Sequence, residues 1–287
     1  MVRLPTAANG MVGVVKRREL PPSLRALGRR DPPPTVRVGQ VEYALRRTFK
    51  HDFFAATAMY ESPADDRVIV KFGRRADFLG LPMCWAGRLL VRHETEALRR
   101  LAGVDGVPRL IEQPRRGRGD AALALVREFV EGEVLRKGRA VPDDFFARLA
   151  VVLDAIHERD MAYVDLEKPE NVLVGEDGRP WLFDFQISWC VPPRWGGRTR
   201  LARWIGRRFQ SADRYHLLKL RRRIRLDQLT PEEIETSYRR PVYVRWHNWL
   251  IQPFQRIRRR TLERLDPRRR VGERGRVETP ETEGATT

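Results

Sequence analysis

The sequence predicts an α+β fold with two lobes, of which the first is small and rich in strands and the second is mainly helical. A run of β-branched residues at 67–71 indicates a strand, and a helical pattern follows it at 90–110. Residues 172–184 have the pattern of a β-hairpin with a turn at Glu176-Asp177-Gly178. With 287 residues, 41% of them hydrophobic, the chain can bury a substantial core, so one two-lobed domain with extensions fits better than two independent domains.

The ends of the chain differ in composition from its middle. Residues 1–38 are rich in proline and arginine, and we expect them to form an arm over the surface with at most one helical turn near Leu24. The two lobes are then expected at 39–127 and 128–235. Beyond them we expect a basic amphipathic helical extension at 236–270 and a disordered, polar tail at 271–287.

A lysine and a glutamate are placed so that the first lobe can bring them together. Lys71 ends the predicted strand, and Glu94 lies one helical turn from Leu98 in the helix that follows. If the apolar side of this helix packs inward, Glu94 can reach Lys71. Glu96 is the competing partner, although it points to a different side of the helix. A lysine at the end of a strand is more often solvated, but its position before this helix favours the pairing.

Two aspartates and an asparagine are spaced around the predicted hairpin. Asp165 follows a hydrophobic run, Asn171 opens the first strand and Asp184 closes the second. The hairpin folds Asn171 back towards Asp184, so two oxygen ligands face one point, as a hard cation such as Mg²⁺ requires. Asp165 then lies nearby, where it can accept a proton from an attacking hydroxyl. Two ordinary surface acids beside a hairpin would be the alternative, and the full spacing argues against it.

With these motifs, residues from about 40 to 220 resemble the protein-kinase-like superfamily. The chain looks like a divergent bacterial member, similar to lipopolysaccharide-core sugar kinases and to atypical Ser/Thr kinases. The resemblance implies that Lys71, held by Glu94, orients the α- and β-phosphates of ATP. It also implies roles for residues of the second lobe: Asp165 as the catalytic-loop aspartate, Lys168 as the lysine that steadies the γ-phosphate, Asn171 as a metal ligand, and Asp184 as the aspartate of the DFG triplet.

The segment ALALVREFVEGEVL, at 122–135, resembles the strand and hinge that hold adenine in this superfamily. The resemblance implies that backbone groups of Glu128 and Val130 face the base.

The region where the nucleotide loop belongs departs from the family pattern. The chain has no GxGxxG motif there and reads TFKHDFFAATAMYE at 48–61. A phosphate cradle of glycine amides is therefore not predicted. Lys50, His51 and Asp52 form either a side-chain substitute for that cradle or an ordinary hairpin turn, and the sequence leaves both open.

The catalytic motifs also depart from the family pattern. Tyr163-Val164-Asp165 replaces the HRD triplet, so the arginine that receives a phosphate is absent, and we expect competence without phosphorylation. Asp165 and Asn171 are one position further apart than in the form DLKPEN, which implies an insertion near Glu167. The insertion shifts Lys168 by one position relative to Asp165. Gln186 replaces the glycine of the DFG triplet and restricts the backbone.

Three further polar residues lie in the second lobe. His157 ends an apolar helical pattern, and we expect it to be a hydrogen-bonded packing residue. Arg159 and Asp160 have the sequence of an RD motif, but they precede the apolar strand. Asp160 is therefore expected to have no catalytic role. Asp213 is a candidate for a buried aspartate that braces the catalytic loop.

The charge of the chain is concentrated near its C-terminus. Residues 191–270 contain 23 Lys and Arg against 7 Asp and Glu, a surplus of 16 within a chain whose net charge is +18. Such a surface attracts phospholipid headgroups, phosphorylated glycolipid or nucleic acid. An apolar helical stripe predicts either a helix in the membrane interface or one docked on the second lobe, and nucleic acid is less expected because these aromatic residues lie on the stripe. The stripe comprises Val242, Trp246, Trp249, Leu250, Phe254 and Ile257.

Cysteine content and hydropathy indicate a cytoplasmic protein. Cys84 and Cys190 are the only cysteines, which is too few for a disulfide framework, and their spacing is not that of a metal site. The sequence has no apolar stretch near the length of a membrane span and no run typical of a secretory signal at its N-terminus. We therefore expect a cytoplasmic location, with a peripheral position at the inner face of the membrane if the basic region binds lipid.

Two functions are predicted from these observations. The first is an ATP- and Mg²⁺-dependent phosphotransferase that moves the γ-phosphoryl group of ATP to a hydroxyl on a protein or on the sugar of a membrane glycolipid. The second is a pseudokinase scaffold that binds anionic membrane or nucleic acid through the basic region. A scaffold has no need to retain the lysine, the asparagine and both aspartates together, which favours the enzyme.

Overall fold

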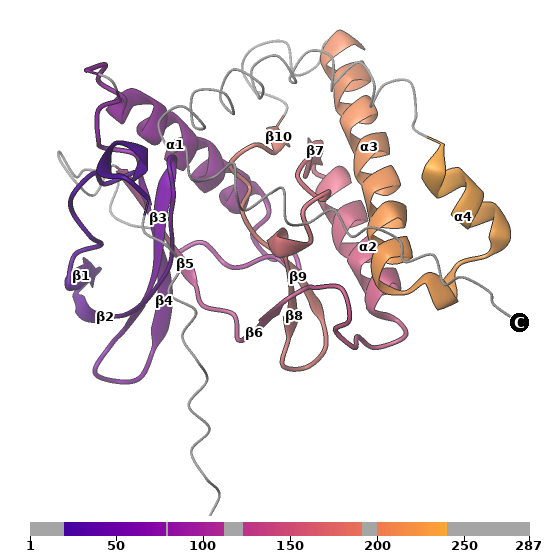
Figure 1. The fold of residues 1–287 in the computed structure, drawn as a ribbon, viewed down its shortest axis with the longest axis horizontal. Helices are drawn as coiled ribbons and strands as arrows, with labels where there is room; N and C mark the ends of the chain where they lie inside the picture. Colours follow the sequence, from indigo (N-terminus) through magenta and orange to yellow (C-terminus); the bar gives the residue numbers. More distant parts are fainter. Residues whose placement is uncertain (1–19, 79, 112–122, 191–199, 240–287) are drawn as a thin grey trace, which may run out of the picture.

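The computed structural model describes residues 20–78, 80–111, 123–190 and 200–239. Figure 1 shows a strand-rich lobe beside a mainly helical lobe, with the β8–β9 hairpin between the sheet and helix α2. The α+β fold with two lobes that the sequence predicts is confirmed.

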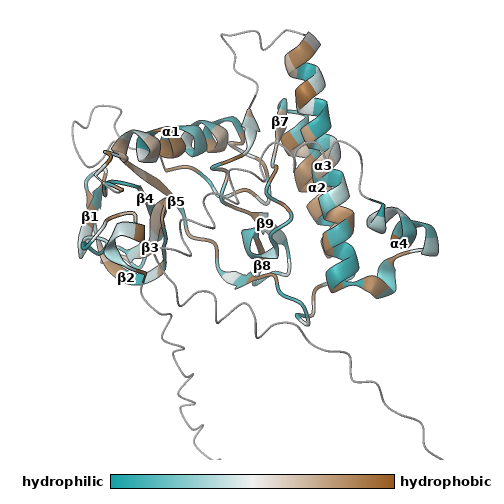
Figure 2. Ribbon diagram, turned by 45° about the horizontal axis from the view of Figure 1, so that its top comes forward, coloured by the Kyte–Doolittle hydropathy of each residue, from teal (hydrophilic) through white to brown (hydrophobic). Residues whose placement is uncertain are grey.

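The first lobe is built on an antiparallel sheet of five strands in the order β1-β2-β3-β4-β5. Figure 2 shows that hydrophobic residues gather in its central strands. In β4, six consecutive residues after Arg67 are buried, because this strand has a neighbour on each side and is covered by helix α1. The strands comprise β1 (Thr35–Val38), β2 (Val41–His51), β3 (Ala55–Glu61), β4 (Arg67–Gly73) and β5 (Ala124–Glu128).

The boundary expected at residue 38 is wrong, because residues 20–38 are part of the first lobe. The expected turn near Leu24 is present as a short 3-10 helix, η1 (Pro22–Leu24), but it is packed into the lobe and Leu24 is buried. Strand β1 pairs with β2 along its whole length. Ala26 is also fully buried and its N–H donates to the carbonyl of Asp52 at 2.7 Å. A few buried apolar residues are sufficient to anchor this stretch, rich in proline and arginine, to the first lobe.

Helix α1 (Cys84–Arg100) packs on β4 and β5 through a face that includes Val91, Glu94 and Leu98. These residues are three and four positions apart, the spacing of one side of a helix. The helix approaches the end of β4 closely, since a Cβ atom at Gly87 would lie 2.2 Å from the carbonyl oxygen of Arg74. Only glycine permits this approach, which sets the helix beside Lys71.

One large apolar cluster fills the second lobe and continues to helix α1 and strand β5 of the first lobe. Its central helix is α2 (Phe145–His157), which buries Leu149, Val152, Leu153 and Ile156, the face that the sequence predicts. The predicted hairpin forms from β8 (Val172–Gly175) and β9 (Pro180–Leu182), with Gly178 in the turn at φ 76°. The remaining elements of this part are β6 (Gly132–Val134), β7 (Met161–Ala162), η3 (Pro169–Asn171) and β10 (Trp189–Cys190).

Helix α3 (Arg200–Ile224) spans the second lobe and leads through η4 (Leu226–Gln228) to α4 (Pro231–Tyr238). Figure 2 shows hydrophilic residues alternating with hydrophobic ones along α3. Helix α4 begins with a capping box in which Thr230 and Glu233 satisfy each other's backbone N–H groups. The expected boundary at residue 235 therefore falls inside a helix, which Arg222 of α3 holds through the hydroxyl of Ser237 at 2.9 Å.

Most of the basic extension and the whole of the expected tail, including the apolar stripe at 242–257, lie outside the described residues. Among the helices that the structure does describe, none combines the length and the apolar character needed to cross a membrane.

Candidate active site

Three charged side chains from separate elements meet between the lobes. The ammonium of Lys71 on β4 lies 2.7 Å from Glu94 Oε2 on α1 and 2.7 Å from Asp184 Oδ1, which follows β9. Lys71 is 7% exposed and Glu94 is 1% exposed, so this cluster is shielded from water. Glu96 instead pairs with Arg99 and Arg100 on the outer face of the helix. Of the two glutamates that the sequence offers, Glu94 is the partner of Lys71.

The cluster keeps a cation between two acids. Burial alone would lower the pKa of Lys71, but the charges of Glu94 and Asp184 raise it above its usual value. Burial raises the pKa of Glu94 against the attraction of Lys71. Burial would also raise the pKa of Asp184, yet Lys71, with further contributions from Lys50 and Lys168, holds it below its usual value. Lys71 is therefore charged, and Asp184 is ionised at neutral pH.

Asp165 lies in the loop between β7 and η3, with its carboxylate held from two sides. Its Oδ2 accepts a hydrogen bond from Lys168 Nζ at 2.6 Å and another from Asn171 Nδ2 at 2.8 Å. The extra residue in this loop is accommodated because Glu167 turns away and pairs with Lys219 of α3 at 2.6 Å. Lys168 therefore reaches Asp165 in spite of the insertion.

Asn171 and Asp184 are brought together by the backbone of the hairpin. The N–H of Phe183, directly before Asp184, donates to the carbonyl of Asn171 at 3.3 Å. The hydroxyl of Tyr163 donates to the carbonyl of Phe183. The Asn171 amide nitrogen is used by Asp165, which leaves its amide oxygen available to a cation.

These two side chains fit a Mg²⁺ ion better than a metal that needs an all-protein cage. Within the described ranges, no group of three or more His, Cys, Asp or Glu is placed to hold a metal. Mg²⁺ keeps several waters and is usually held by one or two protein oxygens together with phosphates of a nucleotide. The amide oxygen of Asn171 and the carboxylate of Asp184 supply such a set.

A buried aspartate fixes the start of the loop that contains Asp165. Asp213 on α3 is fully buried, and its two oxygens accept the N–H groups of Tyr163 and Val164, each at 2.7 Å. His157 lies 3.0 Å from the same carboxylate through Nε2, which agrees with the hydrogen-bonded packing role expected for it. Val164 is held at φ 72°, a conformation that a β-branched residue adopts only when its surroundings enforce it. Asp213 is therefore the brace that the sequence suggests.

The residues after β9 are also held in an unusual conformation. Asp184 has φ 68°, in the left-handed region, and its side chain points to Lys71. Phe185 is fully buried and packs edge-on against the ring of Tyr163, with centroids 5.1 Å apart. Positive φ values at residues other than glycine cluster at functional sites, because the surroundings must offset their cost. The backbone at Gln186 shows no positive φ, so glutamine replaces glycine there without strain of this kind.

The turn that replaces the glycine loop is built from side-chain contacts. Asp52 Oδ1 accepts the N–H groups of Phe54 and Ala55 at 2.9 and 3.0 Å, so these amides cannot bind phosphate. The His51 ring accepts the N–H of Leu27 through Nε2 at 3.1 Å. His51 and Asp52 therefore hold an ordinary turn together and do not form a side-chain substitute for the phosphate cradle. Lys50 is half exposed, 2.7 Å from Asp52 Oδ2, and close enough to Asp184 to affect its pKa.

The hinge differs from the expectation at Glu128. Its N–H donates to the carbonyl of Arg109 at 3.0 Å, so this group is not available to a base. Its carbonyl already accepts a hydrogen bond from Arg127 Nη1 at 3.2 Å. Val130 has no backbone hydrogen bond to any residue that the structure describes, and it stays the candidate that faces the base.

Arg127 is the residue of this cleft that the sequence analysis did not single out. Its guanidinium lies 5.6 Å from the centre of the Phe183 ring and is close to Glu94 and Asp184. Burial lowers the pKa of Arg127, while the charges of Glu94 and Asp184 oppose that change. A charged residue directly after the apolar run ALALV was the signal that could have identified it.

Comparisons with known proteins show a likeness only in overall fold. No protein-family model matches the chain, and no curated protein matches it. A solved Rio2 kinase–ADP/Mg²⁺–phosphoaspartate complex from Chaetomium thermophilum is 15% identical with a TM-score of 0.47, covering 68% of this chain and 61% of that one. The Rio2 kinase of the same organism is 15% identical with a TM-score of 0.45, covering 64% and 59%. This chain thus spans only about three fifths of each Rio2 chain.

Both solved proteins are kinases. Neither bears on the expected relation to bacterial lipopolysaccharide-core sugar kinases, which stays a prediction. We base the function on the side-chain geometry of this chain.

Proposed function

We propose that this protein is an ATP- and Mg²⁺-dependent phosphotransferase that transfers the γ-phosphoryl group to a hydroxyl acceptor. The observation that supports this is the meeting of two groups of side chains. Lys71, Glu94 and Asp184 form one of them, and Asp165 with Lys168 and Asn171 forms the other. The Phe183–Asn171 hydrogen bond connects the two.

Each residue is assigned a role by the chemistry of its side chain. Lys71, kept charged and oriented by Glu94, binds the α- and β-phosphates. Asn171 and Asp184 hold Mg²⁺, which when bound neutralises charge on the β- and γ-phosphates. Lys168 is 59% exposed in its side chain and adjoins the carboxylate of Asp165, where it can bind the γ-phosphate.

Asp165 is assigned as the proton acceptor. Its contacts with Lys168 and Asn171 both use Oδ2, which leaves Oδ1 to accept the proton of the acceptor hydroxyl. In this step the hydroxyl oxygen bonds to the γ-phosphorus, the bond to the bridging oxygen of ATP breaks, and ADP leaves.

We further propose that the enzyme is competent without phosphorylation. The ion pair of Lys71 with Glu94, which many kinases form only on activation, is already present here, and Val164 stands where a phosphate-binding arginine would be. An activity that arises only after phosphorylation between Ile187 and Arg207 would contradict this.

Nucleotide binding tests the proposal against the pseudokinase alternative. Thermal unfolding should be measured with ATP alone, Mg²⁺ alone and both together. We expect the combination to stabilise the protein by more than the sum of the separate effects, because the metal binds between protein oxygens and phosphates. Transfer from γ-labelled ATP to the protein itself, then to membrane glycolipid and protein fractions, identifies the acceptor. A scaffold would show no transfer in any of these assays.

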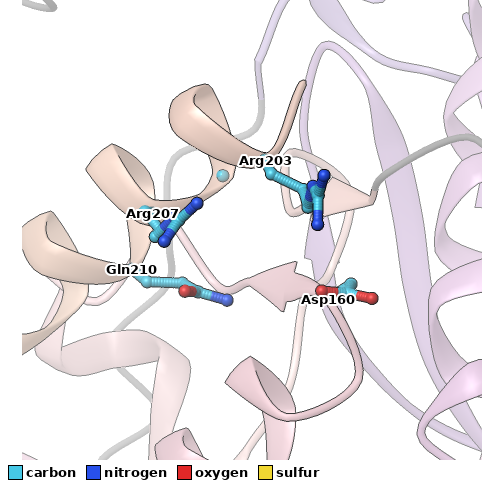
Figure 3. A pocket seen from close by; sticks show the side chains of 5 residues that line it. Asp160, Arg203, Arg207 and Gln210 are labelled. Atoms are coloured by element: carbon cyan, nitrogen blue, oxygen red, sulfur yellow. The ribbon is translucent and has the colours of Figure 1, made fainter. Parts of the chain in front are cut away.

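Helix α3 supports a proposed anionic partner. Arg203 and Arg207 lie one turn apart and line a cavity of about 270 Å³ that Asp160 and Gln210 complete. Figure 3 shows both arginine side chains extending from α3 into this space. Beside them Trp204 is 53% exposed. An exposed indole between arginines matches the interface of an anionic membrane, so we propose peripheral attachment there, from the cytoplasm.

Vesicle binding tests this partner. Wild-type protein should cosediment with vesicles that contain phosphatidylserine and not with vesicles of phosphatidylcholine alone. Replacing Arg203 and Arg207 together by glutamine should weaken that binding. Arg214→Gln removes a charge from the same helix, at a residue that pairs with Asp154 at 3.1 Å, and serves as the control. Preference for RNA over anionic vesicles at equal salt would refute the membrane proposal.

A further inference from the structure

Arg127 lies on the wall of the cleft between the phosphate end and the hinge. It is in β5, where its Cα partner on β4 is Ile69, two residues before Lys71. Residues two apart on a strand point to the same face, so Ile69 and Lys71 share one face of β4. Arg127 lies beside Ile69, and therefore on the hinge side of Lys71. A base whose edge faces Val130 would present its neighbouring edge to this residue.

The guanidinium has hydrogen-bonding capacity that the protein does not use. Arginine has five N–H donors and no acceptor. Among the described residues, the one hydrogen-bond acceptor of Arg127 is the carbonyl of Glu128, at 3.2 Å from Nη1, and no carboxylate forms an ion pair with it. Arg127 as a whole residue is partly exposed, and none of its guanidinium nitrogens is among the buried polar atoms that lack a partner, so the remaining donors can reach a ligand in the cleft.

The same contact changes what the hinge offers to a base. A free carbonyl at Glu128 would accept a hydrogen bond from an amino group, such as the one at position 6 of adenine. Here that carbonyl is already shared with the guanidinium, and the Glu128 N–H is bound to Arg109. The guanidinium beside this carbonyl therefore presents donors at this point, which match an oxygen at position 6 better than an amino group.

We propose that Arg127 is a specificity-determining residue that favours purines with an oxygen at position 6, so that GTP competes with ATP as the phosphoryl donor. The proposal rests on the proposed function, because it assumes that a nucleotide occupies this cleft. Arginine recognises guanine in the same way in nucleic acids, through the oxygen at position 6 and the nitrogen at position 7. Adenine offers only the nitrogen, beside an amino group that repels the guanidinium donors.

The test is the ratio of affinities for nucleotides that differ at the base. Mg²⁺ with ADP, GDP or IDP should be titrated by calorimetry into the wild type, Arg127→Met and Arg109→Met. We expect the wild type to bind GDP and IDP more tightly than ADP, and Arg127→Met to lower the GDP/ADP and IDP/ADP ratios roughly tenfold. Arg109 is the control, because its side chain is 73% exposed and contacts the carboxylate of Glu128. Its loss should leave both ratios unchanged.

Each outcome supports or overturns the inference. Equal ratios in the wild type and Arg127→Met would show that Arg127 only balances the charges of Glu94 and Asp184, and would overturn it. A preference for GDP without one for IDP would also overturn it, since IDP lacks only the 2-amino group. If Arg127→Met does not fold, Arg127→Lys decides, because it keeps the charge but loses the planar fork, and both ratios should fall about threefold. A wild type that binds none of the three refutes the proposed function instead.

Discussion

The loop around Asp165 and the turn at residues 51–55, which replaces the glycine loop, hold their shapes in different ways. The carboxylate of Asp165 is held by local contacts, since Lys168 and Asn171 lie three and six residues away in the chain, while Asp213 holds the backbone at the start of the loop from α3. The turn at residues 51–55 depends on distant residues, because Arg74 donates to the carbonyls of Phe53 at 2.8 Å and Ser23 at 3.0 Å. The carboxylate proposed as proton acceptor thus lies in a compact local pattern, whereas the turn that replaces the glycine loop is also fixed by long-range contacts of Arg74.

Arg74 shows how the second arrangement works. It is fully buried, with its guanidinium 4.0 Å from the centre of the Phe53 ring. A third carbonyl, that of Asp77, accepts from it at 3.0 Å. A glycine-rich phosphate loop can adapt its backbone. Here the buried guanidinium of Arg74 and the segment before β1 hold the turn in one shape. Lys50, directly before this turn, remains the candidate side chain for a contact with the phosphates.

The largest effect expected from breaking the local arrangement is at Asp165. Asp165→Asn removes the proton acceptor but keeps the hydrogen-bond geometry, and turnover should fall roughly 10²- to 10⁴-fold. Nucleotide affinity should change little. Asp105→Asn, on the surface beside Arg179, is the control for loss of a carboxylate. Initial rates with labelled ATP measure the effect, and a variant that keeps its rate would refute the role of Asp165.

The two glutamates of α1 provide a matched pair of variants. Glu94→Gln weakens the hold on Lys71 and should lower the transfer rate about 10- to 100-fold, because a hydrogen bond to a charged group contributes about 1.5–3 kcal/mol. Glu96→Gln removes the same charge two residues away, where the side chain pairs only with surface arginines, and should leave the rate unchanged. Equal effects of the two variants would mean that the buried pair has no catalytic role.

A variant of Arg74 separates the turn at residues 51–55 from the loop around Asp165. Arg74→Ala leaves three carbonyls without their donor, so unfolding free energy should fall by at least about 2 kcal/mol and Tm by about 4–8 °C. Nucleotide affinity should fall as the turn loosens. Arg92→Ala, an exposed arginine of α1, controls for loss of an arginine. Unchanged stability would show that the turn does not depend on Arg74.

The smallest expected effect is the pH dependence due to Asp184. Its pKa is held below the ordinary value of 3.8, so its contribution to stability is present above that pH and is lost as the pH falls through the lower value of the folded state. Urea unfolding of the wild type and Asp184→Asn at pH 6 and pH 3 measures it. The difference between the two proteins should shrink at pH 3. A difference that stays constant would mean that Asp184 does not interact favourably with Lys71.

Local patterns predicted more of this molecule than long-range ones. The spacing of Asp165, Asn171 and Asp184 and the helical period at Glu94 are short-range signals, and the structure brings these side chains together with Lys71. Arg127 was missed because its partners, Phe183, Asp184 and Glu94, are distant in the chain. The outer arm predicted at 1–38 fails at residues 20–38, because composition does not reveal that Leu24 and Ala26 are buried and that β1 pairs with β2.

A crystal structure with Mg²⁺ and a non-hydrolysable ATP analogue tests the central claim most directly. We predict that the metal contacts Asn171 and Asp184, that Lys71 contacts the α- and β-phosphates, and that Asp165 faces the γ-phosphate. A nucleotide bound outside this cleft, or a metal that contacts neither Asn171 nor Asp184, would contradict the account.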